Sequence, residues 1–194
     1  DGGAAATAYI AASFPFFLNL WMAATKCILL AANGIEGSSL ITSIGGNGID
    51  FGMQVAGQPG RWFTVPAAAP AAIYNPGLSE INGLGAIGDS VVVDAFGLGA
   101  MALVFAPEQQ KGLEPVLPDD ALQLPQRLLG RAHTGFTQTG ALFGTAARQI
   151  VDLQTSPLVA LGVIDIDGEK GRVGGGIYRP PLELFSHACR ALDR

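Results

Sequence analysis

The chain has 194 residues, of which 49% are hydrophobic and only 14% are charged, with a formal net charge of −5. This length fits one domain with a large core, and the scattered positions of the 11 Lys and Arg residues argue against a nucleic-acid surface. Because charged residues make up about 25% of a typical protein, we expect a partner to cover apolar surface, and we predict a homo-oligomer. We treat residues 1–194 as one domain that starts with a helical portion over 1–36.

Residues 8–32 are predicted to form a helix that ends at the following Asn-Gly pair. The segment 14–32 is long enough to cross a bilayer, but Pro15, Asn19 and Lys26 interrupt it. We therefore expect a buried amphipathic helix and no membrane span. The chain starts without Met and without the basic region of a signal peptide, so we expect a piece of a longer protein.

The spacing of side chains divides this predicted helix into two faces. A polar face carries Asn19, Ala23 and Lys26 at i, i+4 and i+7. The large apolar side chains share the other face, and these are Phe14, Phe17, Trp21 and Ile28. We expect the apolar face to make the contacts, and we expect a homodimer to pack this helix near its own copy.

Six glycines and two prolines interrupt the strand-like stretch 44–66. We predict strands over 38–44, 49–55 and 61–65, joined by turns, as a three-stranded antiparallel meander. The middle strand alternates, with one face formed by Ile49, Phe51, Met53 and Val55. Gly52 lies inside that strand, where a glycine marks a bulge or the close approach of another group.

The middle of the chain is predicted to be loop-rich over 66–90 and then mainly helical. The small apolar residues of 91–106 favour a buried helix over a strand followed by a helix. Residues 118–133 begin with acidic residues and predict a helix interrupted by Pro125, and 141–152 predicts a further short helix.

The C-terminal part predicts a β-hairpin and a last helix. Strands over 157–167 and 172–178 flank a turn, and a helix follows at 182–192. The order of the elements therefore predicts an α+β fold, with a mainly antiparallel sheet, meander plus C-terminal hairpin, packed against several helices.

Cysteine and histidine are too few to suggest a cofactor. Cys27 and Cys189 lie in separate apolar segments and are expected to be buried free thiols, as suits a reducing cytoplasm. His133 and His187 have no metal-ligand spacing with them. We therefore predict neither a metal nor another cofactor.

Two glycine-containing motifs in the middle of the chain need separate interpretations. The sequence GLGAIG at 83–88 matches G-x-G-x-x-G, but no strand is predicted before it, so it does not indicate a dinucleotide site. The next motif places Asp89 and Ser90 before an apolar run. The pair is either a helix N-cap or two groups directed at a polar ligand.

Glycines and arginines supply the candidate anion-binding groups. The run Gly174, Gly175 and Gly176 lies between Arg172 and Arg179. It is either an anion-binding concavity of backbone N–H groups or a β-bulge at a sheet edge. Arg61 and Arg148 are further candidate clamps for a carboxylate or a phosphate.

Several sequence patterns together resemble the YlbE-like family. They are FFLNL…K at 16–26, NG..FG..V.G...RWFT.P at 47–66, IGDS at 87–90 with GLG at 97–99, and G..RQIVDLQTSPLVALGV at 144–163 before a G..GGG…P pattern. The resemblance runs over nearly the whole chain in the same order. It implies the C-terminal part of a component of the oxamate carbamoyltransferase assembly, which converts oxalurate and phosphate to oxamate and carbamoyl phosphate in allantoin breakdown. An FdrA-type protein is the partner that this resemblance implies.

The chain departs from the family pattern at three places. Gly85 and Ala86 stand where relatives carry Pro-Asp, and Asp94 stands where they carry Glu. A His-Lys pair of the relatives is replaced around Ile164 and Asp165. The third departure implies a different substrate, or none, if that pair contacts the ligand.

The predicted function is that of a transferase subunit that acts on small carboxylate or carbamoyl anions. Catalysis would then rest on orientation and charge stabilisation. The alternative is a non-catalytic subunit that organises the assembly. No catalytic residue is assigned, and the ligand-binding candidates are Asn47, Arg61, Asp89, Ser90, Asp94, Arg148, Gly174, Gly175, Gly176 and Arg179.

Overall fold

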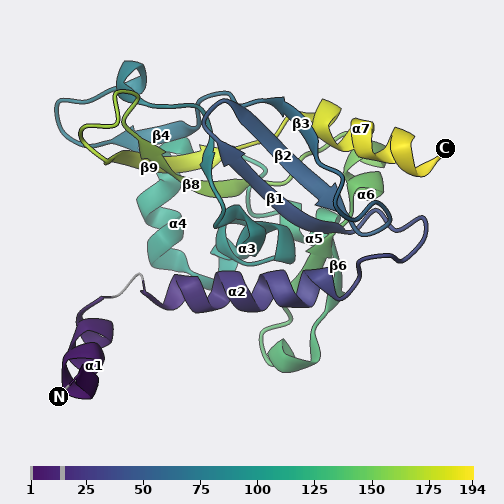
Figure 1. Cartoon of the computed structure of the whole chain (residues 1–194), viewed down its shortest axis with the longest axis horizontal. Helices are drawn as coiled ribbons and strands as arrows, with labels where there is room; N and C mark the ends of the chain where they lie inside the picture. Colours follow the sequence, from purple (N-terminus) through teal and green to yellow (C-terminus); the bar gives the residue numbers. More distant parts are fainter. Residues whose placement is uncertain (1, 14–15) are drawn as a thin grey trace.

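The computed structural model describes residues 2–13 and 16–194, and it begins with two helices. These are α1 (Gly2–Ala12), which has no buried residue and stands apart from the other elements in Figure 1, and α2 (Phe16–Leu30). The prediction of a single helix over 8–32 is therefore wrong. Pro15, which lacks the N–H that a continuous helix requires there, comes between the two in the sequence.

The predicted meander forms the core of a four-stranded antiparallel sheet. Its strands are β1 (Ile41–Asn47), β2 (Asp50–Val55), β3 (Phe63–Pro66) and β5 (Ile87–Gly88), in the order β3-β2-β1-β5. Phe51, Met53 and Val55 are fully buried on one face, as predicted. Ile49 is not part of that face, because it lies in the turn before β2 and is 75% exposed.

The glycines of this sheet are required by close contacts within the protein. A side chain at Gly46 would overlap the carbonyl oxygen of Ala86 just before β5. A Cβ at Gly52 would lie 3.2 Å from Cε3 of Trp62, whose ring covers that part of the strand. Gly52 therefore marks a close approach, one of its two predicted alternatives.

A second antiparallel sheet contains the C-terminal hairpin. Its strands are β4 (Ala71–Tyr74), β8 (Val159–Ile164) and β9 (Arg172–Tyr178), in the order β4-β9-β8. The hairpin was predicted, whereas β4 lies in a stretch predicted to be loop-rich. The register skips Val173 as a bulge, but β9 is the central strand, so the predicted position of a bulge at a sheet edge is wrong.

Helices and a third, two-stranded sheet cover these layers. The helices are α3 (Val91–Phe96), α4 (Pro107–Leu113), α5 (Leu124–Leu128), α6 (Ala147–Asp152) and α7 (Leu182–Leu192). The small sheet pairs β6 (Leu129–Ala132) with β7 (Leu142–Thr145). Short 3-10 turns complete the chain as η1 (Glu80–Asn82), η2 (Gly99–Phe105), η3 (Glu114–Val116) and η4 (Thr134–Phe136).

The predicted α+β class is confirmed, whereas three helix boundaries need correction. Residues 91–106 form α3 and then η2, separated at Gly97. Pro125 does not interrupt a helix over 118–133, because it occupies the first turn of α5, where its missing N–H costs nothing. The helix predicted over 141–152 is β7 followed by α6.

The predicted faces of α2 are correct only in part: Asn19 and Ala23 are exposed and Trp21 packs against the smaller core, as predicted, but Lys26, Phe17 and Ile28 lie on the opposite sides to those predicted. Lys26 lies on the inner side with the buried Thr25 and Leu29, whereas Phe17 is 57% and Ile28 is 47% exposed. Phe14 lies outside the described residues. Cys27 is exposed on the same helix, which corrects its predicted burial, and Cys189 is buried as predicted.

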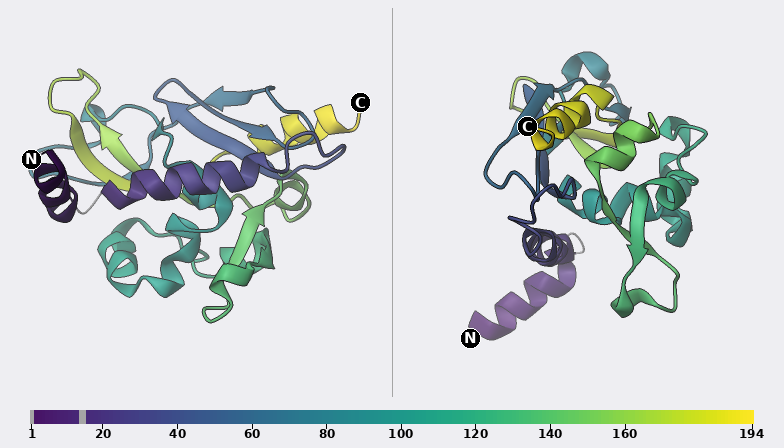
Figure 2. Two further views of the ribbon diagram at one scale, coloured as in Figure 1. Left: turned by 60° about the horizontal axis from the view of Figure 1, so that its bottom comes forward. Right: turned by 90° about the vertical axis from the view of Figure 1, so that its right-hand side faces the viewer.

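Figure 1 shows α2 crossing beneath α3, and Figure 2 shows the same helix from two further directions. α2 also contacts β1 directly, because Lys26 Nζ donates a hydrogen bond to the carbonyl oxygen of Thr42. The main core lies around the fully buried Phe51, Met53, Leu124, Ile150 and Phe185. A smaller core contains Leu29, Val92, Phe96 and Phe143 under α2. Within the described residues, no single helix is both long and apolar enough to cross a membrane. The bent pair α1 and α2 meets the two criteria only when both helices are counted together.

Candidate functional site

The junction between β5 and α3 lies between two hollows on the surface. Asp89 lines one hollow and Ser90, the next residue, lines the other. Ser90 immediately precedes α3, but its side chain makes no capping hydrogen bond. The hydroxyl group of Ser90 is therefore not used to hold the helix start, which was one interpretation of the motif.

The larger hollow, which we call the Arg172 hollow, has a volume of about 830 Å³. It lies between the glycine run of β9 and the residues Gln109, Gly112 and Leu113 of α4. Leu18 of α2 contributes an apolar wall. The polar side chains that line it are Asn75, Ser90, Gln109 and Arg172.

Arg172 lies across the glycine-rich strands because they have no side chains there. Its Nε donates a hydrogen bond to the carbonyl oxygen of Gly174 at 2.9 Å. A Cβ at Gly175 would be only 2.6 Å from Nη2 of Arg172, and one at Gly162 would be 3.3 Å from Nε. The glycines thus let the guanidinium rest on the sheet with its outer N–H groups at the hollow.

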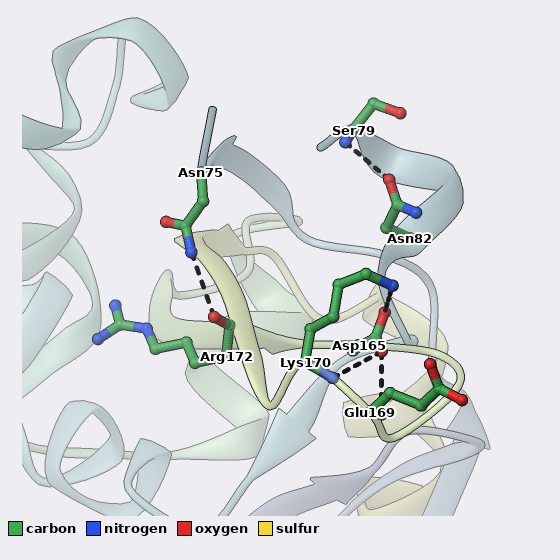
Figure 3. A network of polar contacts seen from close by, with 7 residues as sticks. All are labelled: Asn75, Ser79, Asn82, Asp165, Glu169, Lys170 and Arg172. Atoms are coloured by element: carbon green, nitrogen blue, oxygen red, sulfur yellow. Dashed lines mark hydrogen bonds and ion pairs between the residues drawn. The ribbon is translucent and has the colours of Figure 1, made fainter. Parts of the chain in front are cut away.

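No carboxylate among the described residues forms an ion pair with Arg172. In Figure 3 its side chain extends away from the nearby pair Asp165 and Lys170. A guanidinium carries five N–H donors in a planar fork that matches a carboxylate or a phosphate. Arg172 is therefore suited to hold a small anion in this hollow.

Asp165 is bound within the β8–β9 turn and does not line the Arg172 hollow. Its Oδ2 accepts hydrogen bonds from the backbone N–H groups of Glu169 and Lys170, both at 3.0 Å, and Lys170 Nζ lies 3.6 Å from Oδ1 (Figure 3). The backbone N–H of Lys170, more than any other group, lowers the pKa of Asp165. The departure from the family pattern at this position thus falls in a structural turn.

The second hollow, which we call the Lys26 hollow, consists of two adjoining cavities of about 350 and 360 Å³ that share Ile44, Trp62 and Asp89. Lys26 Nζ donates hydrogen bonds to the carbonyl oxygen of Thr42, at 2.9 Å, and to Oγ of Ser43. Burial lowers the pKa of Lys26. The hollow therefore combines an apolar wall with one cationic group.

Asn47 also lines the Lys26 hollow, but its side chain already has partners. Its Oδ1 accepts hydrogen bonds from the backbone N–H groups of Ile49, at 2.9 Å, and Asp50, at 2.7 Å. The side chain thus closes the turn between β1 and β2. A ligand at this hollow would meet the amide nitrogen of Asn47 and not its bonded oxygen.

Asp94 lies inside the protein, one helical turn beyond Ser90. Its Oδ1 accepts hydrogen bonds from the backbone N–H groups of Ala100, at 2.7 Å, and Ala160, at 3.1 Å. Burial raises the pKa of Asp94 from 3.8 to about 7, and the two N–H groups oppose that rise. The carboxyl joins three elements below the site, since Ala160 belongs to β8 and lines the Arg172 hollow.

The remaining predicted arginines are away from both hollows. Arg148 forms an ion pair with Asp193 at 2.7 Å. Arg179 binds both carboxylate oxygens of Asp120, with Nη1 at 3.2 Å from Oδ2, and this pair lowers the pKa of Asp120. The guanidinium of Arg61 lies 5.0 Å above the centre of the Phe63 ring.

The structure thus divides the predicted site residues into separate groups. Asn47 and Asp89 lie at the Lys26 hollow, and Ser90 with the glycine run lies at the Arg172 hollow. The backbone of the run pairs with strands on both sides, so its N–H groups do not form an open concavity. Within the run, Gly175 leaves space for Arg172, whereas Gly174 and Gly176 allow close approach of the β4 backbone.

Sequence reasoning did not place Lys26, Trp62, Asn75 or Arg172 among the candidate site residues, and Arg172 was named only as one end of the glycine run. Lys26 was assigned to a polar, outward face, although a lone charge in a long uncharged segment is a signal of a specific partner. Trp62 and Asn75 had no distinguishing signal, and the position of Asn75 depends on a hydrogen bond to Arg172, which is 97 residues away in the sequence.

The comparisons with known proteins agree on one family. The family model for oxamate carbamoyltransferase subunit AllG matches residues 3–90. The chain is 30% identical over 192 residues to oxamate carbamoyltransferase subunit AllG of Escherichia coli (strain K12), covering 95% of the chain and 46% of that protein. It is 32% identical over 191 residues to uncharacterized protein YahG of the same organism, covering 93% and 40%.

A solved structure supports the fold. The crystal structure of a conserved protein of unknown function from Enterococcus faecalis V583 superposes with a TM-score of 0.79 at 23% identity, over 90% of this chain and 43% of that one. This likeness shows the fold alone. The chain spans less than half the length of each of these three proteins.

Proposed function

The chain belongs to the AllG (YlbE-like) family, and on this premise we propose that it is a subunit of a carbamoyl-transfer assembly that binds a small carboxylate or carbamoyl anion in the Arg172 hollow. Oxamate, oxalurate and carbamoyl phosphate are the ligands that the family name and resemblance suggest. The chemistry would depend on orientation and charge stabilisation. An FdrA-type protein is the proposed partner.

The observation that carries this proposal is the position of Arg172. Its guanidinium rests on glycines, without a carboxylate partner among the described residues, at the edge of a hollow that also contains the uncommitted hydroxyl of Ser90. An arginine held in one orientation can form two parallel hydrogen bonds to a carboxylate. The hydroxyl of Ser90 is then available for the other end of a short ligand, whereas Nδ2 of Asn75 already donates a hydrogen bond to the backbone carbonyl oxygen of Arg172 at 3.2 Å (Figure 3).

The first experiment is calorimetric titration of the chain with oxamate, oxalurate and carbamoyl phosphate. Replacing Arg172→Gln should weaken binding about ten-fold or more, because a hydrogen bond to a charged group contributes about 1.5–3 kcal/mol. Arg131→Gln is the matched control, since it removes the same charge from an exposed position on β6, outside both hollows.

Binding that is equal in Arg172→Gln and in the unaltered chain would refute the assignment of this hollow. If none of the three anions binds at millimolar concentration, the ligand-binding function itself is wrong for this chain.

A second proposed function, assembly without catalysis, is favoured by one surface. The outer side of α2 carries Phe17, Leu20, Ala24 and Ile28 at helical spacing, and all four are exposed. We call this stripe the α2 apolar face. Large exposed apolar patches are typical of protein contacts.

The assembly function is tested by mixing the chain with an FdrA-type protein and measuring the molar mass of the mixture by light scattering. We expect a complex that Ile28→Glu weakens and that Arg172→Gln leaves intact. If no complex forms, or if Ile28→Glu does not affect it, this surface is not the contact.

A further inference from the structure

A cluster of arginines lies between α7 and the edge strand β3, away from the Arg172 hollow and next to the Lys26 hollow, with which it shares Trp62 and Thr64. His187, Arg190 and Ala191 of α7 line one hollow together with Arg194, which follows the end of the helix. Facing them are Arg61 and Trp62, just before β3, with Thr64 in the strand. The strand and the helix lie side by side in Figure 1. We call this the α7 hollow.

The positive charge of this hollow is not neutralised within the described part of the chain. Arg61, Arg190 and Arg194 form no ion pair there, whereas Arg148, close by, is paired with Asp193. Glu183 lies 3.3 Å from Nε2 of His187 and so faces the histidine. Three of the 11 basic residues of an acidic chain thus gather around one hollow.

Neighbouring like charges repel, so a bound anion would stabilise such a cluster. The interactions that hold the three arginines leave most of their N–H groups unused. The guanidinium of Arg61 stacks above Phe63, and Nε of Arg190 makes a long hydrogen bond of 3.4 Å to the carbonyl oxygen of Ser186. Planar guanidinium groups form paired hydrogen bonds to phosphate oxygens.

An aromatic wall completes the hollow. Trp62 is 52% exposed, and its Cε3 edge lies against the position of Gly52 in β2. The volume is about 360 Å³, which suits a small molecule and not a protein segment. An indole ring beside cationic groups provides a surface on which a flat ring can stack. None of the residues that line the Arg172 hollow contributes to this one.

We propose that the α7 hollow binds a phosphorylated small molecule that carries a flat ring, of the class of the nucleoside phosphates. Its phosphate accepts hydrogen bonds from Arg190, Arg194 and Arg61, and its ring stacks on Trp62. This site is independent of the proposed anion site at Arg172. Nucleic acid is a poor alternative, since the chain as a whole is acidic and its other basic residues are dispersed.

The test uses Trp62 as its own reporter. The chain has two tryptophans, so the variant Trp21→Phe leaves Trp62 as the sole source of indole fluorescence. Titrating this variant with AMP should quench the fluorescence and give saturable binding that rising salt weakens. Adenosine, which lacks the phosphate, and inorganic phosphate, which lacks the ring, should each bind at least about ten-fold more weakly.

Variants identify the groups that bind. Arg190→Gln and Arg194→Gln should each weaken AMP binding about ten-fold or more, whereas Arg131→Gln and Arg172→Gln should leave it unchanged. Because all four arginines are exposed, we expect each variant to fold, and thermal melting checks that it does. Calorimetry with Trp62→Leu measures the contribution of the ring without relying on fluorescence.

Three results would overturn the proposal. If AMP does not bind at millimolar concentration, nucleoside phosphates are excluded as the ligand class. Equal binding of AMP and inorganic phosphate excludes the stacked ring. If polyglutamate binds and AMP does not, and if Arg190→Gln abolishes the binding of polyglutamate, the cluster belongs to a contact with an acidic protein partner instead.

Discussion

Gly175 and Gly176 are neighbours in β9, yet a methyl group would meet different obstacles at the two positions. At Gly175 it would meet the guanidinium of Arg172, which is the far end of a flexible side chain. At Gly176 it would overlap the backbone carbonyl of Ala71 in the paired strand β4. The first change therefore displaces a side chain, and the second forces two strands apart.

We expect Gly175→Ala to fold with nearly unchanged stability but to bind small anions several-fold more weakly, because Arg172 can no longer rest on the strand. Gly176→Ala should lower the free energy of unfolding by roughly 2 kcal/mol or more, since overpacking against backbone cannot relax easily. Urea denaturation and calorimetric titration of both variants measure the two effects separately. Equal stability in the two variants would contradict this account.

Individual residues were predicted from the sequence only where local chemistry decides their role. The G-D-S motif predicted Asp89 and Ser90 at a helix start, and they lie at the two hollows. Arg148 and Arg179 carry the same local signals as Arg172, but their acidic partners are 45 and 59 residues away in sequence. Ion pairs over such separations cannot be read from the sequence, so arginines available for a ligand could not be told from paired ones.

At the scale of elements, Asp94 connects α3, η2 and β8 through one buried carboxyl. Burial raises the pKa of this group from 3.8 to about 7, so between those values the folded chain binds more protons than the unfolded chain. Stability from this group is therefore complete at low pH and is lost as pH rises through about 7. Since one pKa unit corresponds to about 1.4 kcal/mol, the loss is of the order of 4 kcal/mol.

This prediction is measured by urea denaturation between about pH 3.5 and about pH 8, a range that spans both pKa values of Asp94. Asp94→Asn keeps an oxygen that can accept both hydrogen bonds but cannot ionise, so its free energy of unfolding should decline less with pH. Asp89→Asn, on the neighbouring surface, is the matched control and should follow the unaltered chain. A decline that is the same in all three proteins would show that Asp94 is not its cause.

The elements themselves were predicted well where a local pattern determines them. Alternation in 49–55 and the turn between 157–167 and 172–178 identified β2 and the hairpin, and α7 begins and ends where predicted. The short strands β4 and β5 were missed, because they are fixed by pairing with strands distant in the sequence. β6 and β7 were missed as well, because their segments were predicted to be helical. For α2, hydrophobicity alone suggested the wrong inner face, since the buried hydrogen bond of Lys26 is a tertiary contact.

At the scale of the whole molecule, the orientation of α2 leaves large apolar side chains at the surface. Phe17 is 57% and Leu20 is 54% exposed on the α2 apolar face. Burial of apolar surface stabilises a contact by about 25 cal/mol per Å². A chain with only 14% charged residues has little polar surface to offset such a patch, which is why we expect α2 to be an interface.

We therefore predict that the chain sediments as at least a homodimer at micromolar concentration, with the α2 apolar faces of two copies in contact across a two-fold axis. The double change Phe17→Glu and Leu20→Glu should produce the monomer of 19.9 kDa, because two carboxylates cannot be buried there without partners. Asn19→Glu adds a charge at an exposed position on the same helix but outside the stripe, and it should leave the dimer intact. Sedimentation of the unaltered chain as a monomer would refute the prediction, and a dimer that persists in the double variant would place the contact on another surface.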